Sequence, residues 1–375
     1  MISEININTG LIDWAVSRAG LDKSELFIKN PSIQEWIEGK KKPTFNQLQD
    51  FARKVHVPFG YLFLQNPPIE NLPIPFFRTQ KGAGQDINLN IFDTITDLQK
   101  RQEWLKDYLI DNEFEKLDFV GKFRDNPQVF KIIEDIRQAL SLDEDWASEY
   151  RTWEDALMGL TQKIEDLGIV VVFNSVVGNN THRPIKVEDC RGFVLVDQYA
   201  PFMFINSADA KAAQMFTIIH ELAHIWTGKS AGFDFRGMQP ANNPIELLCD
   251  KVAAEFLVPE NKFLIQWAET QDISQLAKYF KVSQIVIARR ANDLGKISKS
   301  KFFNFYNDYI QYLNNKKINQ SGGGDFYKTT RKRLSMTYAG HINHAVKSGQ
   351  LLYNEAYRLT GLKGDTFRKF FKENF

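Results

Sequence analysis

The sequence is poor in cysteine and has no long apolar run. Its 375 residues include only two cysteines, Cys190 and Cys249, which cannot form a disulfide framework and suit a reducing compartment. The longest apolar stretches, such as residues 169–173, fall far short of the roughly 18 to 20 residues of a membrane span. The first residues, MISEININTG, lack the basic start and apolar core of a signal peptide. We therefore expect a cytoplasmic protein with no membrane partner.

Neither sign of charge dominates, because the sequence has 47 lysines and arginines and 46 acidic residues, which gives a net charge of +1. The distribution is uneven, however. Residues 315–375 contain 12 basic and 4 acidic residues, a surplus of 8, so the rest of the chain sums to −7. The basic residues are spread out along this segment, and we interpret it as a solvated surface in preference to a nucleic-acid patch.

The length and the 43% of apolar residues predict two or three domains, each with its own core. Residues 1–70 have apolar positions at the spacing of short helices, which predicts a helix-turn-helix bundle. Asp22 is expected to open one of these helices, and Gly20 and Gly39 to end others.

A proline-rich connector at residues 66–77 interrupts the helical pattern, because each proline removes a backbone donor and disfavours helix before it. Together with an amphipathic helix predicted at residues 91–109, it makes up a linking segment assigned to residues 71–115. A mixed domain with a trailing helical module is predicted at residues 116–300, and a helical, basic C-terminal extension at residues 301–375.

The hydrophobic period changes inside the mixed domain. After two predicted helices, short β-branched and aromatic runs at residues 169–173, 192–196 and 201–205 predict a small sheet of three or more strands. The last of these runs is the candidate edge strand, to which an extended peptide could add. The sheet should pack on the helices that follow it, which gives an α+β fold that is mostly helical.

A helix is predicted next, at residues 209–227, with Ser207 or Asp209 as its cap and Gly228 as its end. It contains the pattern H-E-x-x-H, formed by His220, Glu221 and His224. Residues four apart share a helical face, so both imidazoles can reach one ion, and this pattern is typical of zinc metalloproteases. Glu221 lies beside them, where its carboxylate can take a proton from water at the metal and act as general base.

Two histidines leave zinc short of one protein ligand, which predicts a further ligand downstream. Glu246, on a second helix predicted between Pro244 and Pro259, meets this need. Asp250 stands four residues further on, where it could accept the outer N–H of His220 and fix the ring. Glu255 is the competing third ligand, although the 100° step of a helix places it off the face of Glu246.

The run GFVLVDQYAPFMFINSADAKAAQMFTIIHELAHIWTG, followed by IELLCDKVAAEFLVP, resembles the ImmA/IrrE family of metallopeptidases. The resemblance implies a minimal gluzincin-like scaffold with Zn²⁺ on His220, His224 and Glu246, and with Glu221 as general base. It also implies a protein substrate, since several members cleave helix-turn-helix repressors that control mobile elements or stress genes. Residues 273–298 are similar to the helical module that often follows the catalytic core of this family.

The stretch SIQEWIEGKKKPTFNQLQDFARKVHVPFGYLFL resembles the repressor-type, XRE-like helix-turn-helix family. Within it, Glu35 and Glu38 would repel phosphates, and the first 54 residues hold eight basic and seven acidic side chains, so partner recognition stays as open as DNA binding. The candidate contacts to DNA or to a protein partner are Ser32, Gln34, Lys40, Lys41 and Lys42.

Other reactive side chains carry weaker hypotheses. A thiolate of Cys190 could occupy the open position of the metal as a redox switch, although a buried, inert thiol is the more common state of such a residue. Cys249 is interpreted as a small apolar core residue. His182 and Tyr199 are candidates for the oxyanion stabiliser, and His341 and His344 are interpreted as surface or packing residues.

The sequence thus predicts a zinc endopeptidase that cleaves a regulatory protein in a stress, mobile-element or toxin–antitoxin setting. Two alternatives stay open: a DNA-binding transcriptional regulator, or an antitoxin-type binding protein, each with a structural or vestigial zinc site. Glu221 argues against both, because a structural site has no need of a base next to the metal.

Overall fold

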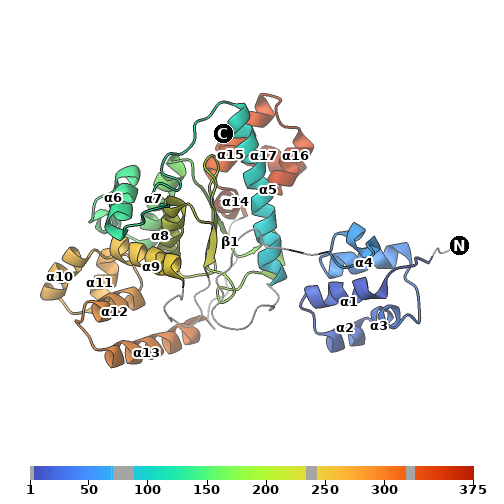
Figure 1. Ribbon diagram of the computed structural model, residues 1–375, viewed down its shortest axis with the longest axis horizontal. Helices are drawn as coiled ribbons and strands as arrows, with labels where there is room; N and C mark the ends of the chain where they lie inside the picture. The colour runs from blue at the N-terminus through green and yellow to red at the C-terminus, as the bar shows by residue number, and fades with distance from the viewer. Residues whose placement is uncertain (1–3, 69, 71–87, 234–242, 318–325) are drawn as a thin grey trace. The chain divides into compact units, whose positions relative to one another are not determined.

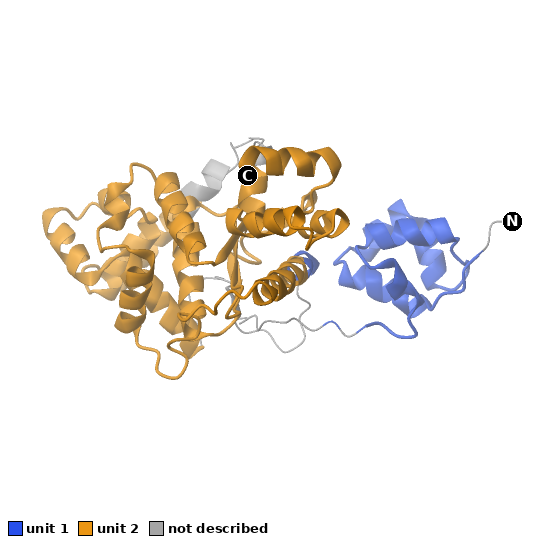
Figure 2. Cartoon of the chain, turned by 90° about the horizontal axis from the view of Figure 1, so that it is seen from above, with its two compact units in different colours: residues 1–73, 81–93 blue, residues 74–80, 94–375 orange. Residues whose placement is uncertain are grey.

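The computed structural model describes residues 4–68, 70, 88–233, 243–317 and 326–375, which fall into two compact units (Figure 2). The second unit takes in α5 from Thr94 onward and all the later elements. Most of the predicted connector at residues 66–77 lies outside the described residues. The described helices include none with the length and apolarity that a membrane span requires. The four-segment division predicted from sequence stays a prediction.

The first unit is built from short helices, as its sequence predicts. Asp22 caps the second helix by accepting from the backbone N–H of Glu25, and Thr44 and Gln47 form a capping box at the fourth. Trp36 packs edge-on against Phe51 in the core, with ring centroids 6.1 Å apart. The elements are α1 (Thr9–Arg18), α2 (Lys23–Lys29), α3 (Pro31–Ile37), α4 (Phe45–Lys54) and the 3₁₀ helix η1 (Phe59–Phe63).

The second unit combines one mixed sheet with helices, so the predicted α+β, mostly helical class is confirmed. Its first half contains α5 (Leu89–Asp111) from Thr94 onward, α6 (Val129–Leu140), η2 (Trp146–Glu149), α7 (Trp153–Asp166), β1 (Val170–Asn174), β2 (Val176–Val177), β3 (Asn180–Pro184), β4 (Gly192–Leu195), β5 (Phe202–Asn206), α8 (Lys211–Thr227), β6 (Ala231–Phe233) and α9 (Pro244–Leu257). The long helix predicted before the sheet corresponds to α5.

The second half of this unit is helical, including the module predicted at residues 273–298 and the basic segment. Its elements are α10 (Glu260–Glu269), α11 (Ile273–Phe280), α12 (Gln284–Asp293), α13 (Lys299–Lys317), α14 (Phe326–Leu334), α15 (Met336–Lys347), α16 (Tyr353–Thr360) and α17 (Gly364–Asn374).

The main sheet has the strand order β1-β5-β4-β6. β1 and β5 are parallel, whereas β4 pairs antiparallel with both β5 and β6. The prediction that residues 201–205 form an edge strand is therefore wrong, because β5 lies between β1 and β4. A strand pattern specifies which side chains face the core, but the order of strands depends on how the crossover after β1 returns to the sheet. Within the described residues, β6 and β1 are the edges of this sheet.

Helices cover both faces of the sheet (Figure 1). On one face, Val171, Met203 and Ile205 belong to the same buried cluster as Ile218 and Leu222 of α8. This cluster also includes side chains of α7, α9 and the helices after it.

The opposite face of the sheet is covered by α5 and the C-terminal helices. The ring of Phe202 contacts Tyr338 of α15 at 5.6 Å, and Tyr338 in turn contacts Trp104 of α5 at 5.8 Å. Glu165 at the end of α7 accepts a hydrogen bond from the hydroxyl of Ser335 at the start of α15. The basic segment is thus partly a structural layer and not only the solvated surface expected from its charge.

α8 begins two residues later than predicted, and neither predicted cap is used. The carboxylate of Asp209 instead lies 3.3 Å from Arg191, while Nε2 of Gln214 donates to the carbonyl oxygens of Ser207 and Asp209. The predicted end is confirmed, because Gly228 adopts a left-handed conformation with φ of 71°.

Candidate metal centre

α8 holds the H-E-x-x-H pattern in the interior of the second unit. His220, Glu221 and His224 are all buried, because α8 is enclosed by the sheet, α7 and α9. The two imidazole rings lie on one face of the helix with centroids 5.0 Å apart, and their Nε2 atoms are 3.2 Å from each other. The helical repeat alone accounts for this convergence, since residues four apart differ by a small angle around the axis.

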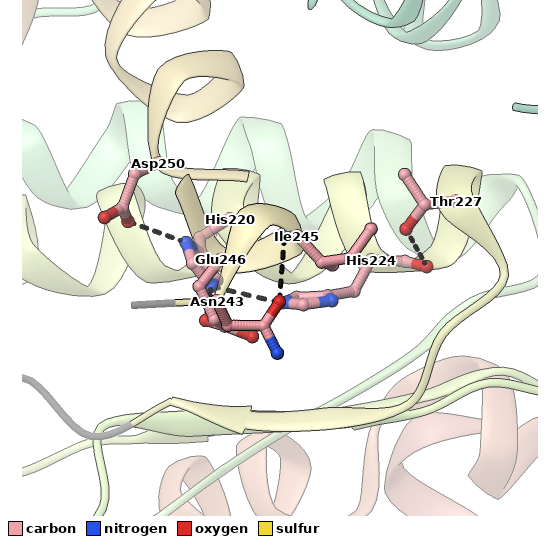
Figure 3. A network of polar contacts seen from close by, with 7 residues as sticks. All are labelled: His220, His224, Thr227, Asn243, Ile245, Glu246 and Asp250. Atoms are coloured by element: carbon pink, nitrogen blue, oxygen red, sulfur yellow. Dashed lines mark hydrogen bonds and ion pairs between the residues drawn. The ribbon is translucent and has the colours of Figure 1, made fainter. Parts of the chain in front are cut away.

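α9 brings the third side chain. Asn243 caps this helix by accepting from the backbone N–H of Ile245, and Pro244 occupies its first position. Glu246 consequently lies in the first turn, where the helix dipole favours a carboxylate. Its Oε2 is 3.1 Å from Nε2 of His220 and its Oε1 is 3.2 Å from Nε2 of His224. Figure 3 shows these three side chains grouped together.

The spacing of these ligand atoms fits a metal ion. Two ligands at about 2.0 to 2.1 Å from a tetrahedral zinc lie about 3.3 Å apart, close to the distances between the two imidazole nitrogens and the carboxylate. Of the His, Cys, Asp and Glu residues that the structure describes, only His220, His224 and Glu246 form a group with ligand atoms all within 4.8 Å of one another. The three side chains could therefore hold a divalent cation.

Asp250 contacts the other nitrogen of the first histidine. Its Oδ1 lies 3.0 Å from Nδ1 of His220, one turn along α9 from Glu246 (Figure 3). A carboxylate in this position accepts the Nδ1–H, so Nε2 is the nitrogen that would bind a metal once the metal displaces its proton.

The carboxylates and imidazoles of the cluster shift one another's pKa. Burial alone would lower the pKa of His220, but its contacts with Asp250 and Glu246 raise it to about 10. Burial alone would raise the pKa of Glu246, but its contacts with both histidines lower it to about 2. Glu246 is therefore an anionic ligand at neutral pH, and the acidic surroundings favour a cation.

Glu221 is held in a different environment from the other acidic residues. Within the described part of the chain, neither of its carboxylate oxygens has a hydrogen-bond partner, and burial raises its pKa well above the ordinary value for a glutamate. A buried carboxyl group with unused oxygens is rare in folded proteins and calls for a functional explanation.

Gly192 of β4 makes room for this carboxylate. A Cβ at this position would lie 2.5 Å from Cγ2 of Thr217, 2.9 Å from the carbonyl oxygen of Phe204 and 3.3 Å from Oε1 of Glu221. Gly192 was not predicted from the sequence, although a glycine in a strand often marks a close approach by another part of the chain. β4 therefore lies directly against the general-base candidate.

The remaining acidic and thiol candidates are not among the three clustered ligands. Glu255 is paired with Arg290 and accepts from the backbone N–H of Glu260, so it is engaged elsewhere. Cys190 is buried with its thiol 3.6 Å from the carbonyl oxygen of Gly192, and it is not part of the three-residue group. Its redox role stays a prediction. Burial and nearby carboxylates raise the pKa of the Cys249 thiol, which suits a core residue.

The histidine and tyrosine candidates have other neighbours. His182 is exposed on β3 and is not part of the cluster, and the ring of Tyr199 lies 5.8 Å from Nζ of Lys116. His344 is hydrogen-bonded through Nδ1 to the hydroxyl of Tyr108 at 2.7 Å. The ring of His341 packs 5.8 Å from that of Tyr108, as expected for a packing residue.

The predicted contact residues of the first unit are partly engaged with acids. Nζ of Lys40 is 2.6 Å from Glu38, and Nζ of Lys41 is 3.6 Å from Glu35. These pairs lower the positive charge of the turn after α3. At this turn and on α3, Ser32 is half-buried, Gln34 donates to Glu38, and Lys42 is exposed.

Comparison with known protein families agrees with the geometry of the centre. Residues 164–292 match the family model described as the IrrE N-terminal-like domain, Peptidase_M78. This range contains every residue of the candidate metal centre, and it supports a protease role of the IrrE type. Residues 334–373 match a domain of unknown function, DUF8813. No curated protein matches the chain.

Proposed function

We propose that this protein is a zinc-dependent endopeptidase in which His220, His224 and Glu246 hold the metal and Glu221 is the general base. The observation that carries the proposal is the pairing of a three-residue ligand cluster with a neighbouring buried carboxylate that has no hydrogen-bond partner among the described residues. A purely structural metal site would have no use for such a carboxylate, because leaving it buried and unpaired destabilises the fold.

Zinc, when bound, supplies Lewis acidity: it polarises a carbonyl oxygen and makes water more acidic. Glu221 accepts the proton of the water that attacks the peptide carbonyl carbon. As the carbon–nitrogen bond breaks, the same side chain returns this proton to the leaving amine. The raised pKa of Glu221 suits both steps, since a carboxyl group with an ordinary pKa would be a weak base and would hold the proton poorly.

The substrate would bind as an extended peptide along β6. This strand pairs with β4 on one side, and Gly192 of β4, which lies against Glu221, is in register with Phe233 of β6. β6 is also the sheet edge next to β4 among the described strands, and an edge offers backbone groups to an added strand. This assignment replaces the β5 edge expected from sequence.

The substrate class is a regulatory protein, either a helix-turn-helix repressor or the product of a neighbouring gene. This part of the proposal is supported by the resemblance to the ImmA/IrrE family, several members of which cleave repressors of mobile elements or stress genes. The setting would be a stress response, a mobile element or a toxin–antitoxin system. The first unit would recognise that protein. The pairing of Lys40 and Lys41 with glutamates favours a protein partner over phosphates of DNA.

The deciding experiment compares wild type, Glu221→Gln and His220→Ala during co-expression with neighbouring-gene products. We expect Glu221→Gln to retain zinc and to lose about 100-fold or more of the cleavage rate, the contribution typical of a general base. His220→Ala should lose both zinc and cleavage. Full cleavage by Glu221→Gln, or absence of zinc from the pure wild-type protein, would refute the proposal.

A further inference from the structure

A cavity of about 210 Å³ lies in the second unit, on the face of the sheet opposite α8. Its floor includes Val172 of β1 and Phe204 of β5, whose neighbours Val171 and Ile205 face α8. Its walls come from α5, α14, the end of α16 and the turn between β2 and β3. The cavity is therefore formed jointly by the peptidase sheet and the C-terminal helices, on a different face from the metal cluster.

Three arginines from three different helices line this cavity, which we call the arginine cavity. Arg101 of α5 is buried, Arg333 of α14 is half-buried, and Arg358 of α16 is exposed. Asp97 supplies the one carboxylate in the lining, and its Oδ2 is 2.7 Å from Nη2 of Arg101. The lining thus holds two more positive than negative side chains.

Two of these guanidinium groups have unused donors. Among the residues that the structure describes, Nε of Arg101 and Nε of Arg333 have no hydrogen-bond partner, although both atoms are buried. A guanidinium group that is kept from water without a partner for each donor destabilises the protein unless an anion offsets it. Burial also lowers the pKa of Arg333, which reflects the same lack of compensating charge.

Arg333 is held in place by a chain of contacts through Asn179. Nη1 of Arg333 donates to Oδ1 of Asn179 at 3.1 Å, and Nδ2 of Asn179 is 3.4 Å from the carbonyl oxygen of Gly361. Asn179 lies in the β2–β3 turn, which Asn174 shapes by donating to the carbonyl oxygen of Gly178. The guanidinium fork of Arg333 is therefore oriented before any ligand binds, and preorganised forks suit oxyanions with several acceptor atoms.

We propose that the arginine cavity binds the phosphate group of a small molecule. The surplus of two positive charges matches a phosphate dianion, whereas a single carboxylate would leave one charge uncompensated. The volume of the cavity is smaller than the about 300 to 1,000 Å³ that is typical of pockets for drug-sized ligands. The ligand is therefore free phosphate or a small phosphate monoester. A nucleic acid is disfavoured, because the cavity is small and Arg101 in its lining is buried.

Titration calorimetry on the full-length protein tests this inference, with inorganic phosphate, glycerol 3-phosphate and acetate as probes. We expect both phosphates to bind and acetate to bind at least tenfold more weakly. Tighter binding of glycerol 3-phosphate than of inorganic phosphate would assign the site to a monoester, and the reverse order to the free ion. Repeating the titrations on His224→Ala, which disrupts the metal cluster, separates this binding from any anion binding at a metal.

Arg358→Gln is the decisive variant, because an exposed residue can be changed without disturbing the core. Losing one charge-assisted hydrogen bond should weaken phosphate binding about tenfold or more. Arg368→Gln on α17 is the matched control, since Arg368 is exposed, pairs with Asp365 and does not line the cavity. The inference is overturned if neither inorganic phosphate nor glycerol 3-phosphate binds. It is also overturned if Arg358→Gln and Arg368→Gln bind phosphate with the same affinity. Neither measurement depends on peptidase activity.

Discussion

The carboxylate of Asp250 lies 3.0 Å from Nδ1 of His220, while the other ring nitrogen of His220 faces His224 and Glu246. Because this contact fixes the tautomer and the orientation of the ring, we expect Asp250→Ala to weaken zinc binding about 10- to 100-fold. Competition with a chromophoric chelator measures the change. The control is Asp293→Ala, which removes an exposed partner of Arg289 and should leave zinc affinity unaltered.

The third ligand is tested by changing each of the two glutamates of α9. Glu246→Gln should abolish stoichiometric zinc binding, because the amide supplies no charge and binds zinc poorly. Glu255→Gln should retain one zinc per chain, since Glu255 is paired with Arg290. Elemental analysis of the two purified variants distinguishes them. Retention of zinc by Glu246→Gln would show that the ligand set is different.

Gly192→Ala should reduce peptidase activity while zinc binding persists. The added methyl group would overlap Thr217 and approach Glu221, so we expect kcat to fall and stability to decrease by about 1 to 3 kcal/mol. Gly340→Ala is the matched control, because a Cβ there meets only Phe375 at 3.5 Å and alanine favours the helix. If both variants had wild-type kcat, the close packing of β4 against Glu221 would be irrelevant to catalysis.

Glu165 should make stability depend on pH. Burial raises its pKa from 4.5 to about 7, although hydrogen bonds from Ser335 and from backbone N–H groups act in the opposite direction. The folded state therefore binds the proton more tightly than the unfolded state. Stability should fall as pH rises from about 4.5 to about 7, by about 3 kcal/mol in total.

Denaturant unfolding of wild type and Glu165→Gln across this range isolates the effect of Glu165 from that of other titrating groups. The difference in free energy of unfolding between the two proteins should change through the window and level off above pH about 8. A constant difference at every pH would contradict the shifted pKa.

Tyr338→Phe should stabilise the protein. Burial raises the pKa of Tyr338, and among the described residues its hydroxyl oxygen has no hydrogen-bond partner. Removing a buried polar group without a partner should increase the free energy of unfolding by about 1 kcal/mol, since the ring contacts with Trp104 and Phe202 remain. A thermal melt that shows a clear loss of stability would reveal an unrecognised partner of this hydroxyl.

Local features of the fold could be predicted because they depend on neighbouring residues. Asp22 caps its helix and Gly228 ends α8, and both functions follow from the backbone conformations that these residue types favour. The convergence of His220 and His224 follows from the helical repeat alone. Glu246 could be proposed because zinc needs a further ligand, although its distance from the histidines depends on how α9 packs against α8.

Features that depend on distant parts of the chain could not be predicted. β5 is an inner strand because the chain places β4 and then β6 beyond it, which no local pattern encodes. Asp209 does not cap α8, because Arg191 lies close to its carboxylate. The role of Gly192 depends on the approach of Thr217 and Glu221 from a helix that follows it by about 20 residues, and sequence spacing gives no sign of this contact.

The edge-on contact of Phe202 with Tyr338 has a practical consequence for any attempt to isolate the range that matches the peptidase family. A polypeptide trimmed to residues 164–292 would retain every metal ligand and yet lose α5, α14 and α15, which shield one side of the strands from water. Its bare aromatic surface, with Phe193 and Phe204 stacked at 4.9 Å, would adhere to other copies, and the shortened polypeptide would precipitate. Of the three shielding helices, α15 belongs to the range that matches DUF8813, whereas α5 and nearly all of α14 lie outside both matched ranges.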